Sequence, residues 1–155
     1  MAKPKINNKA PVFKGPCTGN KEVNLSELKG QNVVLYFYPK DSTPGCTTEG
    51  QDFRDLKGQF TKINTVILGV SRESIKSHEN FKAKEKFNFD LISDPDETIC
   101  KQYDVIKEKS MYGRKYMGIE RSTFLIDAKG KLIQEWRKVK VTGHAKEVFE
   151  AAKQL

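Results

Sequence analysis

The stretch VVLYFYPKDSTPGCTTEGQDFRD, residues 33–55, decides the fold that the sequence predicts. Its first part, Val33–Tyr38, is continuous, apolar and rich in β-branched and aromatic side chains, which is typical of a strand covered on both faces. Thr43 followed by Pro44 predicts a helix start, because threonine caps free backbone N–H groups and proline at the first helical position loses no hydrogen bond. The stretch therefore predicts a buried strand that leads directly into a helix.

The helix that begins at Pro44 carries a cysteine near its start. Side chains at spacings of three, four and seven predict one inward face: Cys46, Phe53, Leu56 and Phe60. In this register Cys46 is the third helical residue, where unpaired N–H groups and the helix dipole favour an anion. Cysteines at helix N-termini are more acidic than free cysteine, and the thiolate is the nucleophilic form. We expect a reactive thiol at Cys46; the alternative is a small buried hydrophobe.

The rest of the chain alternates strand and helix signals. Further strands are predicted at Thr65–Val70, Thr123–Asp127 and Lys131–Trp136. Further helices are predicted at Ser74–Lys86, Glu97–Tyr103 and His144–Gln154. The last two strands flank Ala128-Lys129-Gly130, a hairpin turn in which Gly130 suits a positive φ. This alternation predicts an α/β fold with a central sheet flanked by helices, and the hairpin makes that sheet mixed.

Two segments extend this core. The first 30 residues contain the turn signals Gly15-Pro16 and Gly19-Asn20, which predict a small N-terminal β-hairpin. Residues Ile106–Gly118 carry many charges and two glycines, so we expect a surface loop there. With 155 residues, the chain is long enough for one domain with a real core, and we expect a single domain over residues 1–155.

The chain is strongly basic: it has 28 Lys and Arg residues against 20 Asp and Glu residues, which gives a net charge of +8. A basic surface attracts phosphates without reading sequence. The lysines are spread along the whole chain, however, and no nucleic-acid-binding motif accompanies them. We therefore expect a solvated lysine-rich surface and no nucleic-acid partner.

The apolar pattern, the N-terminus and the number of cysteines together favour a cytoplasmic protein. No run approaches the roughly 18 apolar residues that a membrane helix needs, so no membrane association is expected. The N-terminus lacks the pattern of a secretory signal, and the number of cysteines is odd, at three. Free thiols in a reducing cytoplasm are therefore expected rather than a disulfide framework.

Three residues in PKDSTPGCT, namely Pro39, Thr43 and Cys46, form the Pro-x-x-x-Thr-x-x-Cys motif of peroxiredoxins. The wider stretch YFYPKDSTPGCTTE resembles the bacterioferritin comigratory protein (PrxQ) subfamily, and the likeness continues through LISDPD, ERSTFLID and EWRKVKVTGH. The resemblance covers nearly the whole chain. It implies a thioredoxin-like fold of the AhpC/TSA type, in agreement with the elements above, and a thiol-dependent peroxidase that reduces hydrogen peroxide and organic hydroperoxides.

The resemblance also implies roles for individual residues. Cys46 is the expected peroxidatic cysteine, which attacks a peroxide oxygen and becomes a sulfenic acid. Thr43 is expected to hydrogen-bond the peroxide, and Pro39 to shield the sulfenic acid. Arg121, whose charge is permanent, is expected to stabilise the thiolate and then the departing oxygen. Glu49 either orients Arg121 or is exposed to solvent. No metal or other cofactor is implied.

The resolving thiol of the subfamily is missing from its usual places. It often lies five residues beyond the first cysteine, where this chain has Gln51, or on the next helix, where it has Lys82. A sulfenic acid must nevertheless be reduced by a thiol. We therefore predict a one-cysteine mechanism in which an external thiol, such as glutathione, glutaredoxin or thioredoxin, reduces Cys46. The alternative is a two-cysteine mechanism with Cys17, expected in an exposed turn, or Cys100, expected to be buried.

Two other functions are considered for the same residues. A thiol-disulfide oxidoreductase needs a Cys-x-x-Cys pair, but Thr43 and Glu49 occupy the partner positions. A non-catalytic thioredoxin-fold binding protein would have no need of the peroxiredoxin motif together with Arg121. The two histidines lack metal-ligand spacing; we expect His78 to be exposed and His144 to help cap the last helix. The subfamily resemblance favours a monomer.

Overall fold

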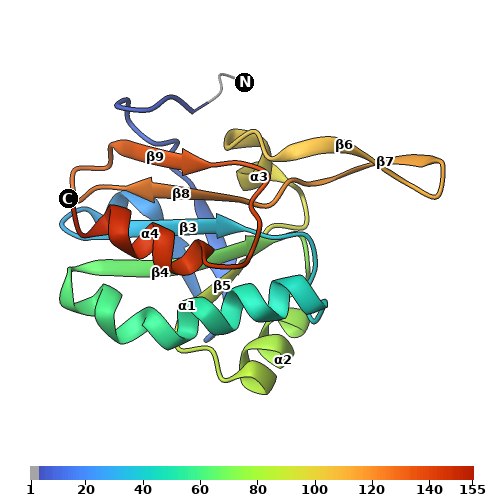
Figure 1. The fold of residues 1–155 in the computed structure, drawn as a ribbon, viewed down its shortest axis with the longest axis horizontal. Helices are drawn as coiled ribbons and strands as arrows, with labels where there is room; N and C mark the ends of the chain where they lie inside the picture. Colours follow the sequence, from blue (N-terminus) through green and yellow to red (C-terminus); the bar gives the residue numbers. More distant parts are fainter. Residues whose placement is uncertain (1–3) are drawn as a thin grey trace.

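A computed structural model describes residues 4–155 of the chain (Figure 1). A seven-stranded sheet lies at its centre, with the strands β1 Lys14–Cys17, β2 Lys21–Asn24, β3 Asn32–Phe37, β4 Thr65–Ser71, β5 Asp90–Ser93, β8 Ser122–Ile126 and β9 Leu132–Trp136. The helices are α1 Pro44–Lys62, α2 Ile75–Glu85, α3 Thr98–Gln102 and α4 His144–Ala152, with a 3₁₀ helix, η1, at Leu25–Leu28.

The sheet is mixed, as the sequence predicts. Its strand order is β2-β1-β5-β4-β3-β8-β9. Strands β3, β4 and β5 run parallel, whereas β8 pairs antiparallel with β3 and β9 antiparallel with β8. The β1–β2 hairpin joins the edge of β5 through the pair Cys17 and Ile92. The predicted thioredoxin-like fold with an N-terminal β-hairpin is therefore confirmed.

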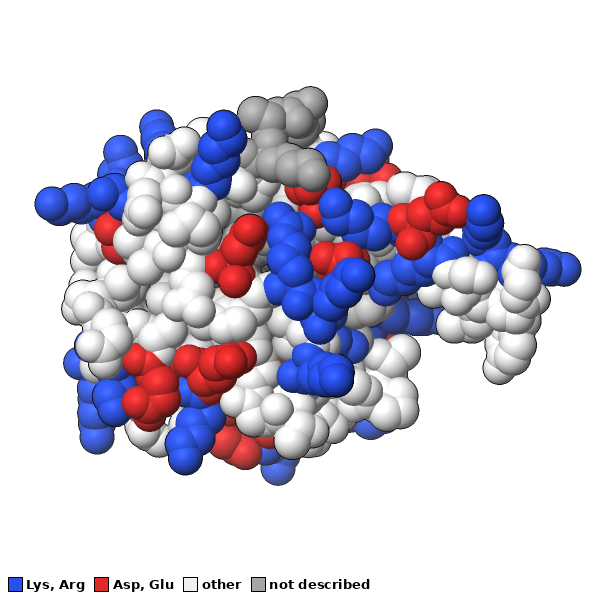
Figure 2. Space-filling view, turned by 45° about the horizontal axis from the view of Figure 1, so that its top comes forward, with Lys and Arg blue, Asp and Glu red and all other residues white. Residues whose placement is uncertain are grey.

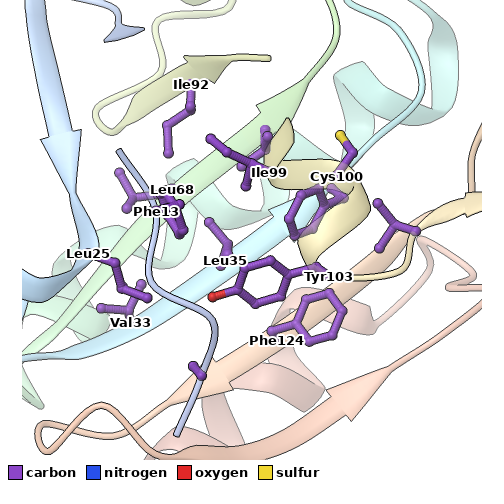
Figure 3. Packing of buried hydrophobic residues seen from close by; sticks show 14 of the residues in the cluster. Phe13, Leu25, Val33, Leu35, Leu68, Ile92, Ile99, Cys100, Tyr103 and Phe124 are labelled. Carbon is purple, nitrogen blue, oxygen red and sulfur yellow. The ribbon is translucent and has the colours of Figure 1, made fainter. Parts of the chain in front are cut away.

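The sheet separates two hydrophobic cores. Successive side chains of a strand point to opposite faces, and β3 sends Leu35 and Phe37 to one face and Tyr36 to the other. The α3-side core contains Phe13, Ile99, Cys100, Tyr103 and Phe124 among others (Figure 3). The α1-side core is built largely from α1, α2 and α4 against the sheet, and includes Cys46, Phe53, Phe60, Phe81 and Val148.

The three cysteines are divided between these cores. Cys46 belongs to the α1-side core, whereas Cys17 and Cys100 belong to the α3-side core. The prediction of a buried Cys100 is confirmed, since it is fully buried. The prediction of an exposed turn at Cys17 is wrong: the residue lies on β1 and is 1% exposed, because the pairing of β1 with β5 carries it into the core.

Most predicted elements match the structure to within a few residues at each end. Ser74 caps α2, its side chain accepting a hydrogen bond from the backbone N–H of Ser77. Gly130 adopts a φ of +87° in the β8–β9 turn, as expected. Gly15-Pro16 is an exception, since it lies within β1 rather than in a turn. A side chain at Gly15 would press on Ile99 and Ile92, so the strand passes the core closely there.

The prediction of a surface loop at Ile106–Gly118 is wrong. Strands β6 Ile106–Met111 and β7 Arg114–Ile119 form a separate antiparallel hairpin, which projects from the body of the molecule (Figure 1). Tyr112 and Gly113 both have positive φ, the conformation that a tight two-residue hairpin turn requires. Most of this ribbon is solvent-exposed, so its sequence lacks the apolar alternation that identifies a half-buried strand.

The surface matches the expected spread of charge. Figure 2 shows lysine and arginine side chains over much of one face, with acidic side chains between them. None of the helices within residues 4–155 combines the length and the apolarity needed to cross a membrane.

Two glycines on α1 provide a test of the packing between α1 and the segment after α2. A Cβ at Gly50 would overlap the ring of Phe87, whereas a Cβ at Gly58 would meet no atom within 4 Å. We expect Gly50→Ala to lower the free energy of unfolding by about 1–3 kcal/mol through overpacking. Gly58→Ala, the matched control, should raise it by about 0.5–1 kcal/mol through helix propensity. Urea denaturation measures both; equal effects would contradict the described packing.

Candidate active site

The candidate site lies where the loop after β3 enters α1. Thr43 is the N-cap residue with extended backbone angles, Pro44 follows it, and Cys46 is the third helical residue, as predicted. The hydroxyl of Thr43, however, donates to the carbonyl oxygen of Lys40 at 2.8 Å and does not cap the helix. The prediction of side-chain capping by Thr43 is therefore wrong. The first turn is left without a side-chain cap, in the region where a helix favours an anion.

Arg121 contacts Cys46, although the two residues are 75 positions apart in the sequence. Its Nη2 lies 3.4 Å from the Sγ of Cys46. Ser122, the first residue of β8, pairs with Phe37 at the end of β3, so Arg121 comes to lie where the chain leaves β3 for α1. Cys46 is 2% exposed and the side chain of Arg121 is 17% exposed. The site is thus a nearly buried thiol with a permanent positive charge beside it.

Glu49 holds the other side of the same guanidinium. Its Oε1 accepts from Nη1 of Arg121 at 2.6 Å, and its side chain is 1% exposed. Of the two roles considered from the sequence, contact with Arg121 is the one that the geometry supports. Burial raises the pKa of Glu49 to about 7, although the charge and hydrogen bond of Arg121 oppose that rise. Among the described residues, no group bonds the Oε2 of Glu49.

Pro39 and Thr43 belong to the loop that joins β3 to α1, and both are partly buried. The loop residue Ser42 has a φ of +63°, a conformation that side chains rarely adopt. The structure therefore brings all four predicted residues to one end of β3: two from the loop, Cys46 from the first turn of α1, and Arg121 from the position just before β8.

A surface hollow of about 360 Å³ opens beside Arg121. It is lined by residues from β6 and from the segments around β8 and β9: Lys107, Glu108, Lys109, Glu120, Arg121, Lys138 and Val139. Burial, assisted by the charges of Arg121 and Arg72, lowers the pKa of Lys109. The surroundings of Arg121 are therefore predominantly basic.

The predictions for both histidines are wrong. His78 is fully buried, with one ring nitrogen 2.7 Å from the carboxylate of Asp41. His144 is buried against Thr123, its Nε2 lying 2.8 Å from the threonine hydroxyl, and Gly143 is the N-cap of α4. Within residues 4–155, no three His, Cys, Asp or Glu side chains converge as a metal site would require.

A buried thiol at an uncapped helix start, in contact with an arginine, is the arrangement of a cysteine nucleophile. Together with the thioredoxin-like fold, it defines the class of thiol-dependent peroxidases. The chain belongs to the AhpC/TSA family, which it matches over residues 6–135.

Similar proteins agree with this assignment. The chain is 57% identical to Peroxiredoxin Bcp of Xanthomonas campestris over 136 residues, 88% of this chain and 85% of that protein. It is 48% identical to Peroxiredoxin Bcp of Bacillus subtilis over 150 residues, 97% of this chain and 96% of that protein.

Solved structures give the same result. The fold superposes on Xanthomonas campestris Peroxiredoxin Q with a TM-score of 0.88 and 54% identity, covering 92% of this chain and 90% of the other. A cysteine-to-serine mutant of Xylella fastidiosa PrxQ superposes with a TM-score of 0.93 and 46% identity. The match covers 99% of this chain and 98% of the other. The predicted peroxiredoxin family and its thiol-dependent peroxidase activity are confirmed.

The raised pKa of Glu49 predicts a pH-dependent stability. Between pH 4.5 and about 7 the folded chain keeps a proton on Glu49 that the unfolded chain releases. The free energy of unfolding, relative to Glu49→Gln, should therefore fall as the pH rises through this window, by at most about 1.4 kcal/mol per pH unit. Urea denaturation at several pH values measures it. The exposed Asp55→Asn on the same helix should follow the wild-type profile; an unchanged profile in Glu49→Gln would contradict the assignment.

Proposed function

We propose that the chain reduces hydrogen peroxide and organic hydroperoxides through Cys46. The observation that carries the proposal is the contact of Nη2 of Arg121 with Sγ of Cys46 at 3.4 Å, because it places a fixed cation at the thiol that must react as an anion. A solved relative supports the substrate class: the Xanthomonas campestris Bacterioferritin Comigratory Protein is described by its alkyl peroxide reduction activity and its trapped intermediate and ligand complexes.

The proposed first step is nucleophilic displacement on oxygen. The thiolate of Cys46 attacks one peroxide oxygen, an S–O bond forms as the O–O bond breaks, and the departing hydroxide or alkoxide takes a proton. Negative charge moves from sulfur to the leaving oxygen, so donors at both ends lower the barrier. Arg121 supplies fixed donors near the sulfur. In this proposal the hydroxyl of Thr43 bonds the peroxide, and Pro39 shields the resulting sulfenic acid.

The proposed recycling uses an external thiol. That thiol condenses with the sulfenic acid of Cys46 to form a mixed disulfide and water, and a second thiol then releases Cys46 as a disulfide leaves. The arrangement of the cores supports this over resolution by another cysteine of this chain. Cys17 and Cys100 lie in the α3-side core, on the opposite face of the sheet from Cys46.

The two positions expected for a second cysteine hold other residues in this chain. Two cysteine-to-serine mutants of Xanthomonas campestris Peroxiredoxin Q are known whose altered positions are 36 residues apart. Cys46 and Lys82 have the same separation here. Lys82 bonds Asp90 at 2.8 Å, and Gln51 bonds Glu85 at 2.9 Å. Both positions where the subfamily resemblance leads us to expect a resolving thiol thus carry polar side chains: Gln51 bonds α2, and Lys82 bonds α2 to β5. This supports a one-cysteine mechanism.

The remaining partners follow from the same proposal. Glutathione, glutaredoxin and thioredoxin are the candidate reductants, and the working unit is a monomer with one domain over residues 1–155. A cytoplasmic location is supported by the three cysteines, all of which are free thiols, since a reducing compartment maintains that state. The mixture of acidic and basic side chains on the surface supports a solvated face rather than a nucleic-acid site (Figure 2).

We expect Cys46→Ser to abolish thiol-dependent peroxide consumption while the circular dichroism spectrum stays that of the wild type. The reason is that serine keeps the shape of the site but is not ionised near neutral pH. Cys17→Ala and Cys100→Ala are the matched controls, and each should retain wild-type turnover with an external thiol. Peroxide consumption is measured with glutathione and glutaredoxin, and separately with thioredoxin. An active Cys46→Ser protein would contradict the mechanism, and loss of turnover in either control would favour a resolving cysteine.

A further inference from the structure

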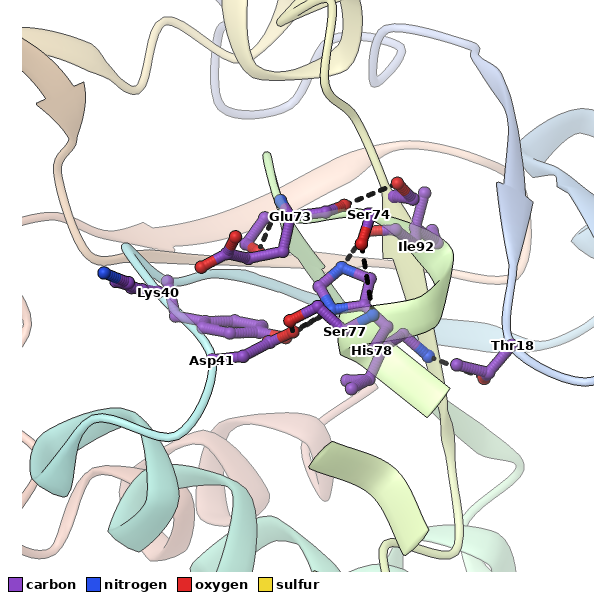
Figure 4. A network of polar contacts seen from close by, with 12 residues as sticks. Thr18, Lys40, Asp41, Glu73, Ser74, Ser77, His78 and Ile92 are labelled. Atoms are coloured by element: carbon purple, nitrogen blue, oxygen red, sulfur yellow. Dashed lines mark hydrogen bonds and ion pairs between the residues drawn. The ribbon is translucent and has the colours of Figure 1, made fainter. Parts of the chain in front are cut away.

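A buried polar network ties the active-site loop to α2 and β5 (Figure 4). Tyr38 donates its hydroxyl to Oδ1 of Asp41 at 2.6 Å. Ser77 donates to Oδ2 of Asp41 at 2.7 Å, and Nδ1 of His78 lies 2.7 Å from the same oxygen. The other ring nitrogen of His78, Nε2, lies 3.0 Å from the carbonyl oxygen of Ile92. The network therefore connects the loop after β3 with two other elements.

The network is well satisfied and well buried. Asp41 is 6% exposed and His78 is fully buried. A buried carboxylate is costly unless donors surround it, and Asp41 faces three of them. Burial raises the pKa of Asp41, but the hydrogen bonds of His78, Tyr38 and Ser77 outweigh that effect and leave it below its usual value. Asp41 is thus held firmly in one place.

The position of Asp41 affects the active-site loop, because Asp41 lies midway between Pro39 and Thr43. The next residue, Ser42, has a φ of +63°, and such strained backbone persists only where the surroundings fix it. The hydroxyl of Thr43 bonds the carbonyl of Lys40, the residue before Asp41. Movement of Asp41 would therefore shift the backbone that carries both Pro39 and Thr43.

The network is separate from the contacts that surround the sulfur. Arg121, the residue before β8, contacts Cys46 and is itself bonded by Glu49 of α1. Asp41 is instead held by Tyr38, which follows β3, and by side chains of α2. A change in the network should displace the loop while leaving the thiol and its arginine in contact.

We propose that Asp41 and His78 are positioning residues for peroxide reduction: their buried contact fixes the loop so that Thr43 and Pro39 face a peroxide bound at Cys46. The proposal rests on the proposed function of Cys46. Attack on a peroxide requires the sulfur, both oxygens and the Thr43 hydroxyl to be aligned. Alkylation of the thiol by iodoacetamide has no such requirement, so the two reactions report separately on the loop and on the sulfur.

The test is Asp41→Asn, which keeps the shape of the side chain and removes its charge. The rate constant for oxidation of Cys46 by hydrogen peroxide should fall by about 10- to 100-fold. The rate constant for alkylation of Cys46 by iodoacetamide should stay at the wild-type value. An unchanged peroxide rate constant in folded Asp41→Asn would overturn the proposal, as would an equal loss in both reactions.

Asp90→Asn is the matched control. Asp90 also links α2 to the sheet, since it bonds Lys82 of α2 and Lys21 of β2 at 2.8 Å each, but it does not touch the active-site loop. Its substitution should lower stability and leave the peroxide rate constant unchanged. A loss in Asp90→Asn as large as that in Asp41→Asn would mean that α2 acts only through general stability, and would overturn the proposal.

A milder variant covers the case in which Asp41→Asn does not fold. Tyr38→Phe removes one hydroxyl from the network and should show a smaller loss in the peroxide reaction, again without a change in alkylation. A wild-type peroxide rate constant in Tyr38→Phe would then count against the proposal. Failure of the proposed function can be told apart from failure of the positioning proposal. If the proposed function is wrong, Cys46→Ser keeps peroxidase activity. If only the positioning proposal is wrong, Cys46→Ser is inactive.

Discussion

The contact between the guanidinium of Arg121 and the thiol of Cys46 is the interaction on which the site depends. It joins the residue just before β8 to the first turn of α1, and Glu49 fixes the arginine from the second turn. Each of the three side chains is largely buried, so each needs the others to offset lost hydration. The strand order brings the two residues together, because β8 pairs antiparallel with β3 and therefore begins beside the loop that leads into α1.

The sheet imposes a second constraint, which concerns recycling rather than peroxide attack. It separates Cys46 from Cys17 and Cys100, since these residues belong to cores on opposite faces. Bringing either thiol to Cys46 would require the chain to open its sheet or its core. Lys82 of α2, one of the two positions where a resolving thiol was expected from the subfamily resemblance, is paired with Asp90. In the proposed mechanism, the reductant comes from outside the chain.

Local patterns were sufficient to predict the strand at β3, the register of α1 and the inward face that carries Cys46, because each depends on neighbours within about two helical turns. The resemblance supplied Arg121, but the burial of Glu49 became evident only from the fold. The burial of His78 could not be predicted from its neighbours in the sequence. Lys76, Glu79 and Lys82 surround it in sequence and suggest a solvated helix, yet Asp41, 37 positions away, holds it in the interior. The β6–β7 hairpin was missed because an exposed ribbon has no apolar alternation.

The fate of the Cys46 sulfur after one equivalent of hydrogen peroxide tests the one-cysteine mechanism most directly. The oxidised protein is treated with dimedone, which traps sulfenic acids, and is mapped without reduction by mass spectrometry. The one-cysteine mechanism predicts one adduct, on Cys46, with Cys17 and Cys100 still as thiols. A stoichiometric disulfide between Cys46 and Cys17 or between Cys46 and Cys100 would contradict it.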